Sequence, residues 1–465
     1  MYFSPMQHQE QHPASFRDPS GYVIRTKDKL QRIVLPEYFP VFEALEKAQI
    51  FEALFKENLL ISHQVIERNS SFICLEPQQI PFITYPYEWS FDQYKHAALT
   101  TLKAHRFLLK KGFVLKDATA FNIAFYKGKP ILLDTLSLDR YQPDTPWRAY
   151  RQFIMHFLLP LVLAVHHGAE QLQLLKLHLD GVPLELGAKM LPYKTKWHPF
   201  LYAHVHLQAK LELKFRNAKA TTKDKMPKLS LKAQLNLVEA LYNYIKKLEL
   251  KQDTEWDTYY HKANYSEIAF DTKKQWIRDK VNQLNTQRLV DLGGNDGTFS
   301  RIFNQNLLQI IVCDIDERAV NENYQKTRNS NEHQLVPMVI NLLNPSPGIG
   351  FEHTERAAFT DRIKAFAPDC IMALALVHHL CLSGNIPFHR LASYFASLGE
   401  TLIVEFPKRE DSWVKHLLQR KMDFEKSFDF YHQSNFETAF AEVFSIVERF
   451  DIPDAARSLY LMRRK

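Results

Sequence analysis

The sequence is poor in cysteine and shows no cysteine spacing of the kind that binds metal or forms a disulfide framework. Its four cysteines, Cys74, Cys313, Cys370 and Cys381, are scattered and form no Cys-x-x-Cys pair. We therefore expect free thiols, no metal site and a reducing compartment, which favours a cytoplasmic location.

Long apolar runs and a secretory leader are also missing. The most apolar segment, residues 157–165, contains Pro160 and is far shorter than the roughly 20 residues that span a bilayer. We interpret it as a buried helix and expect no membrane span. Residues 1–13 are rich in Gln, His and Pro, so we expect no secretory signal and a flexible tail over residues 1–15.

Basic residues are only slightly in excess and form no long stripe. The 59 Lys and Arg side chains exceed the 52 Asp and Glu side chains by 7, and the clearest local excess lies between Lys219 and Lys228. Nucleic-acid-binding domains concentrate basic residues on one face or along one helix. The charge pattern is therefore that of an ordinary surface, and it leaves a nucleic-acid partner unsupported.

The chain does contain enough apolar material for more than one core. It has 465 residues, of which 46% are hydrophobic and 24% charged, and single hydrophobic cores stop growing before this length. Residues 217–228 are polar and lysine-rich, and apolar residues then recur at helical spacing, so we expect a basic linker and an amphipathic helix over residues 217–253. We place one domain at residues 16–216 and another at residues 254–465.

The C-terminal domain alternates helical and strand-like segments. An apolar helix face around residues 270–284 comes first. Short apolar strands are then expected at residues 287–292, 309–314, 336–342, 370–376 and 401–406. Such alternation predicts an α/β fold with a parallel, doubly wound sheet.

A glycine-rich turn follows the first of these strands and precedes a helical stretch. In Val290-Asp-Leu-Gly-Gly-Asn-Asp-Gly297 the glycines permit positive φ and let backbone amides approach a ligand. Counted from Gly293, the remaining glycines of a dinucleotide-binding Gly-x-Gly-x-x-Gly turn would fall at Asn295 and Thr298, so NAD is disfavoured. The turn therefore predicts a different adenosyl cofactor.

The turn resembles the acidic-x-Gly-x-Gly-x-Gly turn of class I S-adenosylmethionine methyltransferases. Asp291, Gly293 and Gly297 match it, with Gly294 beside them, and Asn295 replaces the middle glycine. This departure is mild because asparagine tolerates the left-handed conformation. The resemblance implies a Rossmann-like doubly wound methyltransferase domain that binds S-adenosylmethionine.

A strand that ends in an acid is the second landmark. Asp314 lies 23 positions after Asp291, near the roughly 20-residue offset at which a carboxylate meets a ribose diol. The methyltransferase resemblance gives the acid at this strand tip the same role, and Asp316 is the alternative ligand. Both acids could instead cap the helix expected at Glu317.

Further cofactor residues follow from the same resemblance. Asn341, after the third strand, occupies the place of a residue near the adenine amino group. Ala373 and Leu374 belong to the fourth-strand segment, which borders the methyl-donor site in that family. We expect all three to lie in the cofactor site.

Three residues are candidates for the catalytic chemistry. His378 and His379 could act as general bases, because an imidazole of near-neutral pKa can take a proton from a hydroxyl or an amine. Lining of the cofactor pocket or capping of a helix is the alternative role for both. Glu405, at the tip of the fifth strand, is either an acceptor-side residue or an exposed strand-end acid.

The N-terminal domain has a different pattern, with strand-like residues 21–34 and 59–75 before a helix, which predicts an α+β fold. Asp117, Asn122 and Asp134 then repeat the spacing of a kinase catalytic loop and of the apolar strand that ends in Asp. In kinases and aminoglycoside-phosphotransferase-like enzymes these positions are the base and two metal-binding residues. The resemblance implies a kinase-like domain and a site for Mg-ATP.

Several kinase features are nevertheless missing from this half. No His precedes Asp117, Thr135 and Leu136 replace Phe-Gly, and Gly21 is the one glycine where a phosphate loop would lie. No strand-three lysine can be assigned, although Lys27, Lys29 and Arg32 lie in range. A kinase-like fold without phosphotransfer, an active kinase and a coincidence of spacing are the three interpretations.

Taken together, the motifs resemble a bacterial two-part group labelled NoeA-like. The shared stretches lie at residues 17–23, 81–89, 116–123, 133–137, 373–380 and 402–406. The resemblance implies a methyltransferase with an N-terminal extension, and we predict methyl transfer to a small-molecule hydroxyl or amine. The alternatives are an RNA or protein methyltransferase that uses the N-terminal half as a binding module, a bifunctional protein with an active small-molecule kinase, and a non-catalytic regulatory protein.

Overall fold

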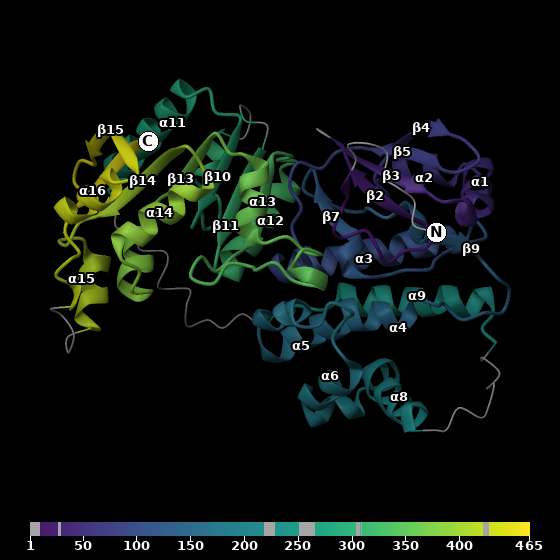
Figure 1. Ribbon diagram of the computed structural model, residues 1–465. Helices are drawn as coiled ribbons and strands as arrows, with labels where there is room; N and C mark the ends of the chain where they lie inside the picture. The colour runs from purple at the N-terminus through teal and green to yellow at the C-terminus, as the bar shows by residue number, and fades with distance from the viewer. Residues whose placement is uncertain are drawn as a thin grey trace. The chain divides into compact units, whose positions relative to one another are not determined.

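The chain forms two compact units in the computed structural model (Figure 1). The structure describes residues 10–26, 29–217, 228–250, 266–303, 307, 309–421 and 427–465. Unit 1 comprises Met1–Lys251 together with Gly348–Arg356, and unit 2 comprises Gln252–Pro347 together with Ala357–Lys465.

Unit 2 is built on a seven-stranded sheet. In spatial order its strands are β12 (Leu335–Val339), β11 (Gln309–Asp314), β10 (Arg288–Leu292), β13 (Cys370–Ala373), β14 (Thr401–Pro407), β16 (Arg457–Arg464) and β15 (Phe444–Asp451). The first five are parallel, and β16 is antiparallel to both of its neighbours. The chain reverses its direction of strand addition beside β10, where open α/β sheets bind ligands at the carboxyl ends of their strands.

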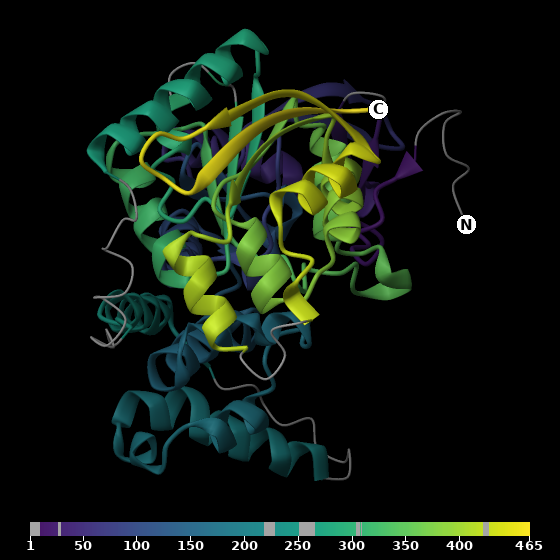
Figure 2. The same ribbon diagram turned by 90° about the vertical axis from the view of Figure 1, so that its left-hand side faces the viewer.

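Helices cover both faces of this sheet (Figure 2). The described helices of unit 2 are α11 (Glu267–Gln283), η9 (Ser300–Phe303), α12 (Glu317–Asn329), α13 (Phe359–Phe366), η11 (His379–Ser383), α14 (Phe388–Leu398), α15 (Ser412–Gln419) and α16 (Gln433–Ala441). On one face, Ile277 and Val281 of α11 pack with Leu289, Met372 and Ile403 of the strands. Successive residues of β11 are buried on alternate faces, as in parallel strands covered from both sides.

The predicted α/β class with a parallel sheet is confirmed, and two details differ from expectation. β13 ends at Ala373 instead of residue 376, because the chain turns through Ala375, whose φ of 49° is incompatible with a strand. The antiparallel hairpin of β15 and β16 was not predicted. Its outer strand β15 is mostly exposed and carries charged residues, so its apolar signal is weak.

Unit 1 begins with a five-stranded antiparallel sheet, which confirms the mixed α and β character expected for this half. Its strands, in spatial order, are β1 (Glu10–Gln11), β2 (Gly21–Arg25), β3 (Leu30–Val34), β5 (Ile73–Pro77) and β4 (His63–Arg68). Helices α1 (Phe39–Lys47) and α2 (Ile50–Lys56) connect β3 to β4. Glu10 and Gln11, which fall within the flexible tail expected at residues 1–15, pair with β2, and residues 1–9 lie outside the described residues.

A long helix and two small two-stranded sheets follow the five-stranded sheet. Helix α3 (Phe91–Leu109) precedes β6 (Phe113–Leu115), which pairs with β9 (Leu138–Arg140), and β7 (Ile123–Tyr126) pairs with β8 (Lys129–Leu132). Helix α9 (Leu231–Lys246) packs against α3. The amphipathic helix is therefore present as predicted, but it belongs to the core of unit 1 and is not part of a linker; residues 218–227 lie outside the described residues.

The remainder of unit 1 is helical. Its elements are α4 (Tyr150–Phe153), η5 (Ile154–Leu158), α5 (Leu159–His167), η6 (Ala169–Lys176), α6 (Leu184–Met190), η7 (Tyr193–Trp197), α7 (Pro199–Leu201), η8 (Tyr202–His206) and α8 (Leu207–Asn217). The predicted buried helix at residues 157–165 is confirmed by η5 and α5, which are almost wholly buried. None of the described helices is long and apolar enough to cross a membrane.

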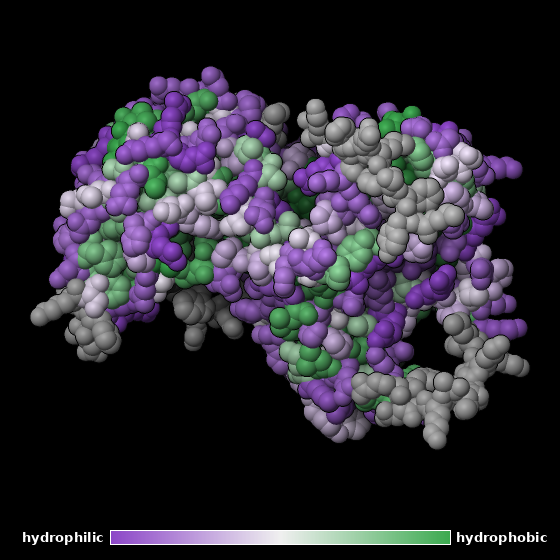
Figure 3. All heavy atoms as spheres, in the orientation of Figure 1, coloured by the Kyte–Doolittle hydropathy of each residue, from purple (hydrophilic) through white to green (hydrophobic). Residues whose placement is uncertain are grey.

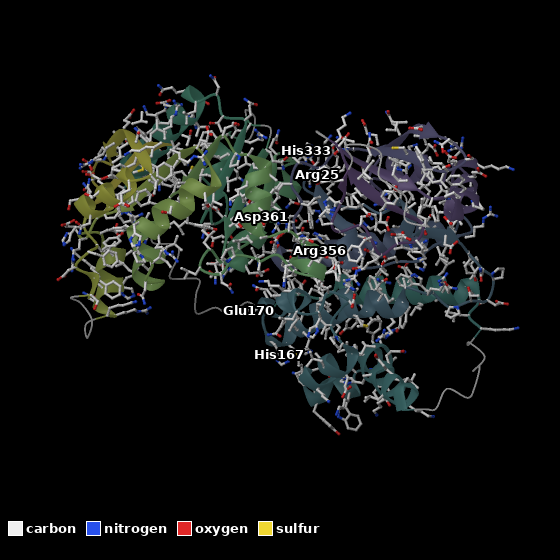
Figure 4. The ribbon with its side chains drawn as sticks, viewed as in Figure 1. Arg25, His167, Glu170, His333, Arg356 and Asp361 are labelled. Atoms are coloured by element: carbon white, nitrogen blue, oxygen red, sulfur yellow. The ribbon has the colours of Figure 1, made fainter. Side chains whose placement is uncertain are left out.

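Unit 1 also contains a short stretch of chain from between β12 and β13. Ile349 and Arg356 pair as an isolated bridge, and Arg17 forms a 2.9 Å ion pair with the buried Glu355. The guanidinium of Arg356, labelled in Figure 4, lies 4.5 Å from the centre of the Phe121 ring. No feature of the sequence predicted that Gly348–Arg356 would belong to unit 1.

Candidate active site

The glycine-rich turn leaves β10 in the conformation that its residues favour. Gly293, Asn295 and Gly297 have φ values of 75°, 50° and 77°. Asn295 therefore takes the left-handed conformation of the glycine that it replaces, as its side-chain type allows. The backbone course of the turn is preserved despite the substitution.

Three backbone amides of the turn donate hydrogen bonds within the protein. Gly293 and Gly294 both donate to the carbonyl oxygen of Cys313, at 2.8 and 3.0 Å, and Gly297 donates to the carbonyl of Gly294 at 2.9 Å. These hydrogen bonds tie the turn to the end of β11 and to itself. The approach of these three amides to a ligand stays a prediction.

Close packing also explains the glycines. A Cβ atom on Gly294 would lie 2.6 Å from Val312 and 2.7 Å from Asp291 Oδ2, and one on Gly297 would lie 2.5 Å from Arg301 Nη1. A side chain at Gly294 would push the turn away from β11, and one at Gly297 would collide with Arg301 and Asn323. The glycines therefore hold the turn against the strand ends, where the two carboxylates lie.

Asp291 is a buried carboxylate with one satisfied oxygen. Its Oδ2 accepts a 2.6 Å hydrogen bond from Ser300 Oγ, whereas Oδ1 is buried and has no hydrogen-bond partner among the described residues. Burial is the main reason why the pKa of Asp291 rises to about 7, and the negative charge of Asp314 adds to the shift. Asp291 Oδ1 thus lacks a donor from the described residues, which a bound group or an ordered water would supply.

Asp314 links the end of β11 to the turn. Its Oδ2 accepts from the backbone N–H of Asn295 at 2.8 Å and its Oδ1 from that of Asp316 at 2.9 Å. Burial raises the pKa of Asp314, and these two hydrogen bonds oppose the rise. Asp316 has the alternative role that the sequence allowed, because its Oδ1 caps α12 by accepting from Arg318 N at 2.9 Å.

The remaining predicted cofactor residues also lie at strand ends. Asn341 comes two residues after β12, half-buried, and its Oδ1 accepts from Leu343 N at 2.9 Å. Ala373 is the last residue of β13 and Leu374 follows it, both buried. Since β12, β10 and β13 are parallel members of one sheet, these residues lie along the same edge as the turn.

The two histidines lie in the helical turn that follows β13. His378 is 2% exposed, and its Nδ1 has no hydrogen-bond partner among the described residues. Burial lowers the pKa of His378 well below its ordinary value, and the nearby His379 and Arg457 lower it further. His378 is therefore neutral at physiological pH, while His379, whose ring centre lies 4.1 Å away, is exposed.

Glu405 is buried within a network of charges. Its carboxylate lies 2.6 Å from Lys273 Nζ and 3.2 Å from Arg457 Nη1, and Arg457 Nε donates to Asp411 at 2.7 Å. The interpretation of Glu405 as an exposed strand-end acid is wrong, because α11 and β16 cover this end of β14. Lys273 was missed, although a lysine in line with Phe270 and Ile277 on an apolar helix face was a usable signal.

The second predicted cluster lies in unit 1, where backbone pairing brings the motif together. Lys116 N donates to Ser137 O at 2.7 Å, and Leu133 N donates to Asn122 O at 2.8 Å. Asn122 donates to Ser137 Oγ at 3.1 Å, which in turn donates to Asp134 Oδ2 at 2.5 Å. Asn122 and Asp134 therefore belong to one hydrogen-bonded group, and burial, together with the charge of the nearby Asp134, raises the pKa of Asp117.

This group does not fit a magnesium ion in the arrangement described. Arg32 Nη1 lies 2.7 Å from Asp134 Oδ1, and Ser137 occupies Oδ2, so both carboxylate oxygens are already engaged. The carboxylate thus has a guanidinium where a kinase would place its metal. Of the other basic candidates, Lys29 pairs with Glu76 at 2.7 Å, and Lys27 lies outside the described residues.

The cysteines and the arrangement of metal-ligand side chains bear on two further expectations. All four cysteines are free and buried, which confirms the prediction of free thiols. Within the described ranges, no group of three or more His, Cys, Asp and Glu side chains is arranged to hold a metal ion.

The charge network predicts a test of stability. Replacement of Lys273 by Met should destabilise unit 2 by about 3 kcal/mol, the lower end of the cost of breaking a buried pair, because Arg457 still neutralises Glu405. The measurement is urea unfolding, followed by pulse-labelling hydrogen exchange of peptides from β14. Because β14 belongs to unit 2, these peptides report the unfolding of unit 2 alone. Lys364→Met, at an exposed position of α13, is the control, and the double variant Lys273→Met, Glu405→Gln should recover at least half of the loss. Additive losses in the double variant would contradict the pairing.

Comparison with known proteins gives one relative along the whole chain. No family model matches the sequence. Nodulation protein NoeA of Rhizobium meliloti (strain 1021) is 29% identical over 466 residues, which cover 97% of this chain and 95% of that protein.

Solved methyltransferases resemble part of the chain. Magnesium protoporphyrin IX methyltransferase from Synechocystis PCC 6803 with bound SAH is 18% identical with a TM-score of 0.29, over 42% of this chain and 81% of that one. N-methyltransferase NodS from Bradyrhizobium japonicum WM9 is 12% identical with a TM-score of 0.30, over 43% of this chain and 99% of that one. The similarity to NoeA, in contrast, runs through both units, and the chain is a whole-length homologue of NoeA, as the shared sequence stretches predicted.

Proposed function

We propose that unit 2 is an S-adenosylmethionine-dependent methyltransferase that acts on a hydroxyl or amine of a small molecule. The observation that carries the proposal is the unused Oδ1 of the buried Asp291, at the carboxyl edge of a parallel sheet and beside the point where strand addition reverses. The acidic-x-Gly-x-Asn-x-Gly turn supports it from the sequence.

The residues of this edge fit the cofactor. The cofactor carries an α-ammonium group, which can donate to a buried carboxylate, so Asp291 Oδ1 is its natural acceptor. Asp314 is the acceptor for the ribose hydroxyls, because it projects from the end of β11 beside the turn. Asn341 and the buried pair Ala373 and Leu374 would border the adenine and the methyl-donor end.

When bound, S-adenosylmethionine supplies an activated methyl group on a sulfonium. The chain's own contribution is to hold the acceptor in line and to exclude water, which is where most of the acceleration of such a transfer arises. His378, neutral and with an unused Nδ1, can accept a hydrogen bond from an acceptor hydroxyl or amine, while its lowered pKa makes it a weak base. Glu405 positions the surrounding side chains through Lys273 and Arg457.

The ribose assignment predicts a loss of affinity. Asp314→Ala should weaken binding of S-adenosylhomocysteine by tenfold or more, as expected from about 1.5–3 kcal/mol for hydrogen bonds to a charged group. Titration calorimetry measures this directly. Asp316→Ala is the matched control, because loss of its helix cap should cost about 1 kcal/mol of stability and leave the affinity almost unchanged. Unchanged affinity in Asp314→Ala would exclude this residue as a ligand.

The raised pKa of Asp291 predicts a pH dependence. Because its pKa is about 7, Asp291 is mostly protonated at pH 6 and mostly ionised at pH 7.5, and only the ionised form attracts an ammonium group. Binding of S-adenosylhomocysteine should therefore tighten by roughly eightfold between these pH values, following the ionised fraction. Asp291→Asn should bind weakly at both, with no such dependence. A parent chain that binds more tightly at pH 6 would refute the assignment.

The acceptor itself is open to a direct search. Incubation of the chain with isotopically labelled S-adenosylmethionine and host extract, followed by mass spectrometry, should place the label on a small molecule. Label on RNA or protein would support the alternative in which the N-terminal half is a binding module. The Asp314→Ala variant controls for labelling that does not depend on the site.

A kinase-like fold for unit 1 is a second proposal, supported by one observation. The two-stranded sheets β6–β9 and β7–β8 bring Asp117, Asn122 and Asp134 close together, with Asn122 and Asp134 joined through Ser137 Oγ, as the motif spacing suggested. The engagement of both Asp134 oxygens speaks against metal-dependent phosphotransfer. We therefore propose a kinase-like fold without this activity.

This second proposal predicts no thermal stabilisation of the parent chain by Mg-ATP. A binding domain would gain stability in proportion to the logarithm of ligand concentration over Kd. Thermal-shift measurements with Mg-ATP and with ATP plus a chelator separate metal-dependent from metal-independent binding. A magnesium-dependent shift that Asp134→Ala abolishes would show instead that the site binds nucleotide.

A further inference from the structure

A short turn in the helical part of unit 1 presents two aromatic side chains to solvent. Tyr193 and Trp197, the ends of η7, are 68% and 78% exposed. Aromatic residues this exposed lose the stabilisation that burial normally provides, so a fixed and exposed pair is informative. Lys194 and Lys196 between them are exposed as well.

The turn is held from inside by its central residue. Thr195 is buried, and its hydroxyl lies 2.7 Å from Pro192 O and 2.8 Å from His206 Nε2. Because Thr195 is anchored inward, the side chains on either side of it are directed outward. The presentation of Tyr193 and Trp197 is therefore built into the fold.

The surrounding helices form one packed group, composed of residues 177–214 and named here the helical platform. Helix α6 packs against α8 and η8, and η7 packs against η8. His167, labelled in Figure 4 at the end of α5, lies 2.9 Å through its Nε2 from Met190 O, which fixes α6 to α5. The platform is thus a stable support for the aromatic turn.

Positive charge gathers on the platform. Lys196 Nζ lies 4.4 Å from the Tyr193 ring centre, and Lys210 Nζ lies 5.5 Å from that of Tyr202. Burial lowers the pKa of His206, and Lys196 and Lys210 both lower it further, so the two lysines lie near the same point.

Acidic residues do not cancel this charge. The platform has five lysines, Lys189, Lys194, Lys196, Lys210 and Lys214, against three acids, Asp180, Glu185 and Glu212. Glu185 is paired with Lys189 at 2.7 Å, and Glu212 with Arg151 at 2.5 Å. Lys194 and Lys196 have no ion pair within the part of the chain that the structure describes. The outward face of the turn is therefore aromatic and cationic.

Aliphatic side chains are exposed on the same platform. Leu177, Leu186 and Leu211 are 78%, 36% and 37% exposed. Figure 3 shows hydrophobic side chains at the surface of this helical part, among hydrophilic ones. A nucleic acid would use the lysines and aromatic rings but has no use for exposed leucines, whereas a bilayer surface uses all three kinds of side chain.

We propose that the helical platform docks on an anionic lipid bilayer surface, with Trp197 and Tyr193 at the headgroup level. Lys194 and Lys196 face the negative lipid headgroups, and their alkyl stems lie along the apolar boundary. This interaction is peripheral and reversible, because a few side chains, and no whole helix, enter the interface. It would bring unit 1 to membranes whose lipids carry negative charge.

The test is co-sedimentation of the full chain with vesicles. The parent should bind vesicles of equal parts phosphatidylglycerol and phosphatidylcholine at low salt, and bind pure phosphatidylcholine weakly. Lys194→Ala with Lys196→Ala should reduce binding by roughly 25-fold, about fivefold for each lysine near an anionic surface. Trp197→Ala should reduce it at least threefold on both vesicle types. Ile268→Ala, at a 66% exposed position of α11 in unit 2, is the control and should bind as the parent does.

Several results would overturn the proposal. Equal binding to neutral and anionic vesicles, or no binding to either, would remove it, as would Trp197→Ala variants that bind like the parent. Retention of an RNA oligonucleotide with no vesicle binding would assign the surface to nucleic acid. Concentration-dependent self-association that Trp197→Ala abolishes, again with no vesicle binding, would assign it to a second copy of the chain. Because all substituted side chains are exposed, unchanged melting temperatures confirm that the variants are folded.

Discussion

Burial of charge at the carboxyl edge of the parallel sheet is the constraint on which unit 2 depends. Strand periodicity places Leu289 and Asp291 on one face of β10, and Ile403 and Glu405 on the same face of β14. Leu289 and Ile403 pack with α11. The acids two residues later, Asp291 and Glu405, therefore lie on the sheet face that the same helix covers. Lys273, one turn before Ile277, forms an ion pair with Glu405. Asp291 keeps its Oδ1 without a hydrogen-bond partner among the described residues. The apolar contacts of α11 with the sheet and the buried charges at the sheet edge are therefore neighbouring parts of one interface.

The glycine turn makes this edge usable. Two backbone hydrogen bonds join the turn to Cys313, and a third joins it to Asp314. The ends of β10 and β11 are therefore held together. Gly294 and Gly297 are small because Val312 and Arg301 leave no room for a side chain. The turn's task is thus to hold two carboxylates at a fixed separation, and the cofactor's donors are expected to meet those carboxylates instead of the turn's amides. This preorganisation is what a methyl transfer, which depends on alignment, requires.

Much of this could be predicted from residue patterns, and the misses have physical causes. Continuous apolar runs identified the five parallel strands because both faces are buried, whereas β15, exposed and charged, left no such run. The left-handed Asn295 followed from the spacing of the turn. One of the two interpretations of Glu405 left it exposed, because its partners, Lys273 and Arg457, lie 132 and 52 residues away, and long-range ion pairs leave no local trace in the sequence. In unit 1 the motif spacing located Asp117, Asn122 and Asp134, but Arg32 became their partner only through the pairing of distant segments.

The central claim is that the unused oxygen of Asp291 and the carboxylate of Asp314 receive an S-adenosyl cofactor. A crystal structure of the chain grown with S-adenosylhomocysteine tests it most directly. The account predicts the ligand's amino nitrogen within hydrogen-bond distance of Asp291 Oδ1 and its ribose hydroxyls on Asp314. A ligand bound elsewhere, or an Asp291 that keeps an unused oxygen beside the bound ligand, would contradict it.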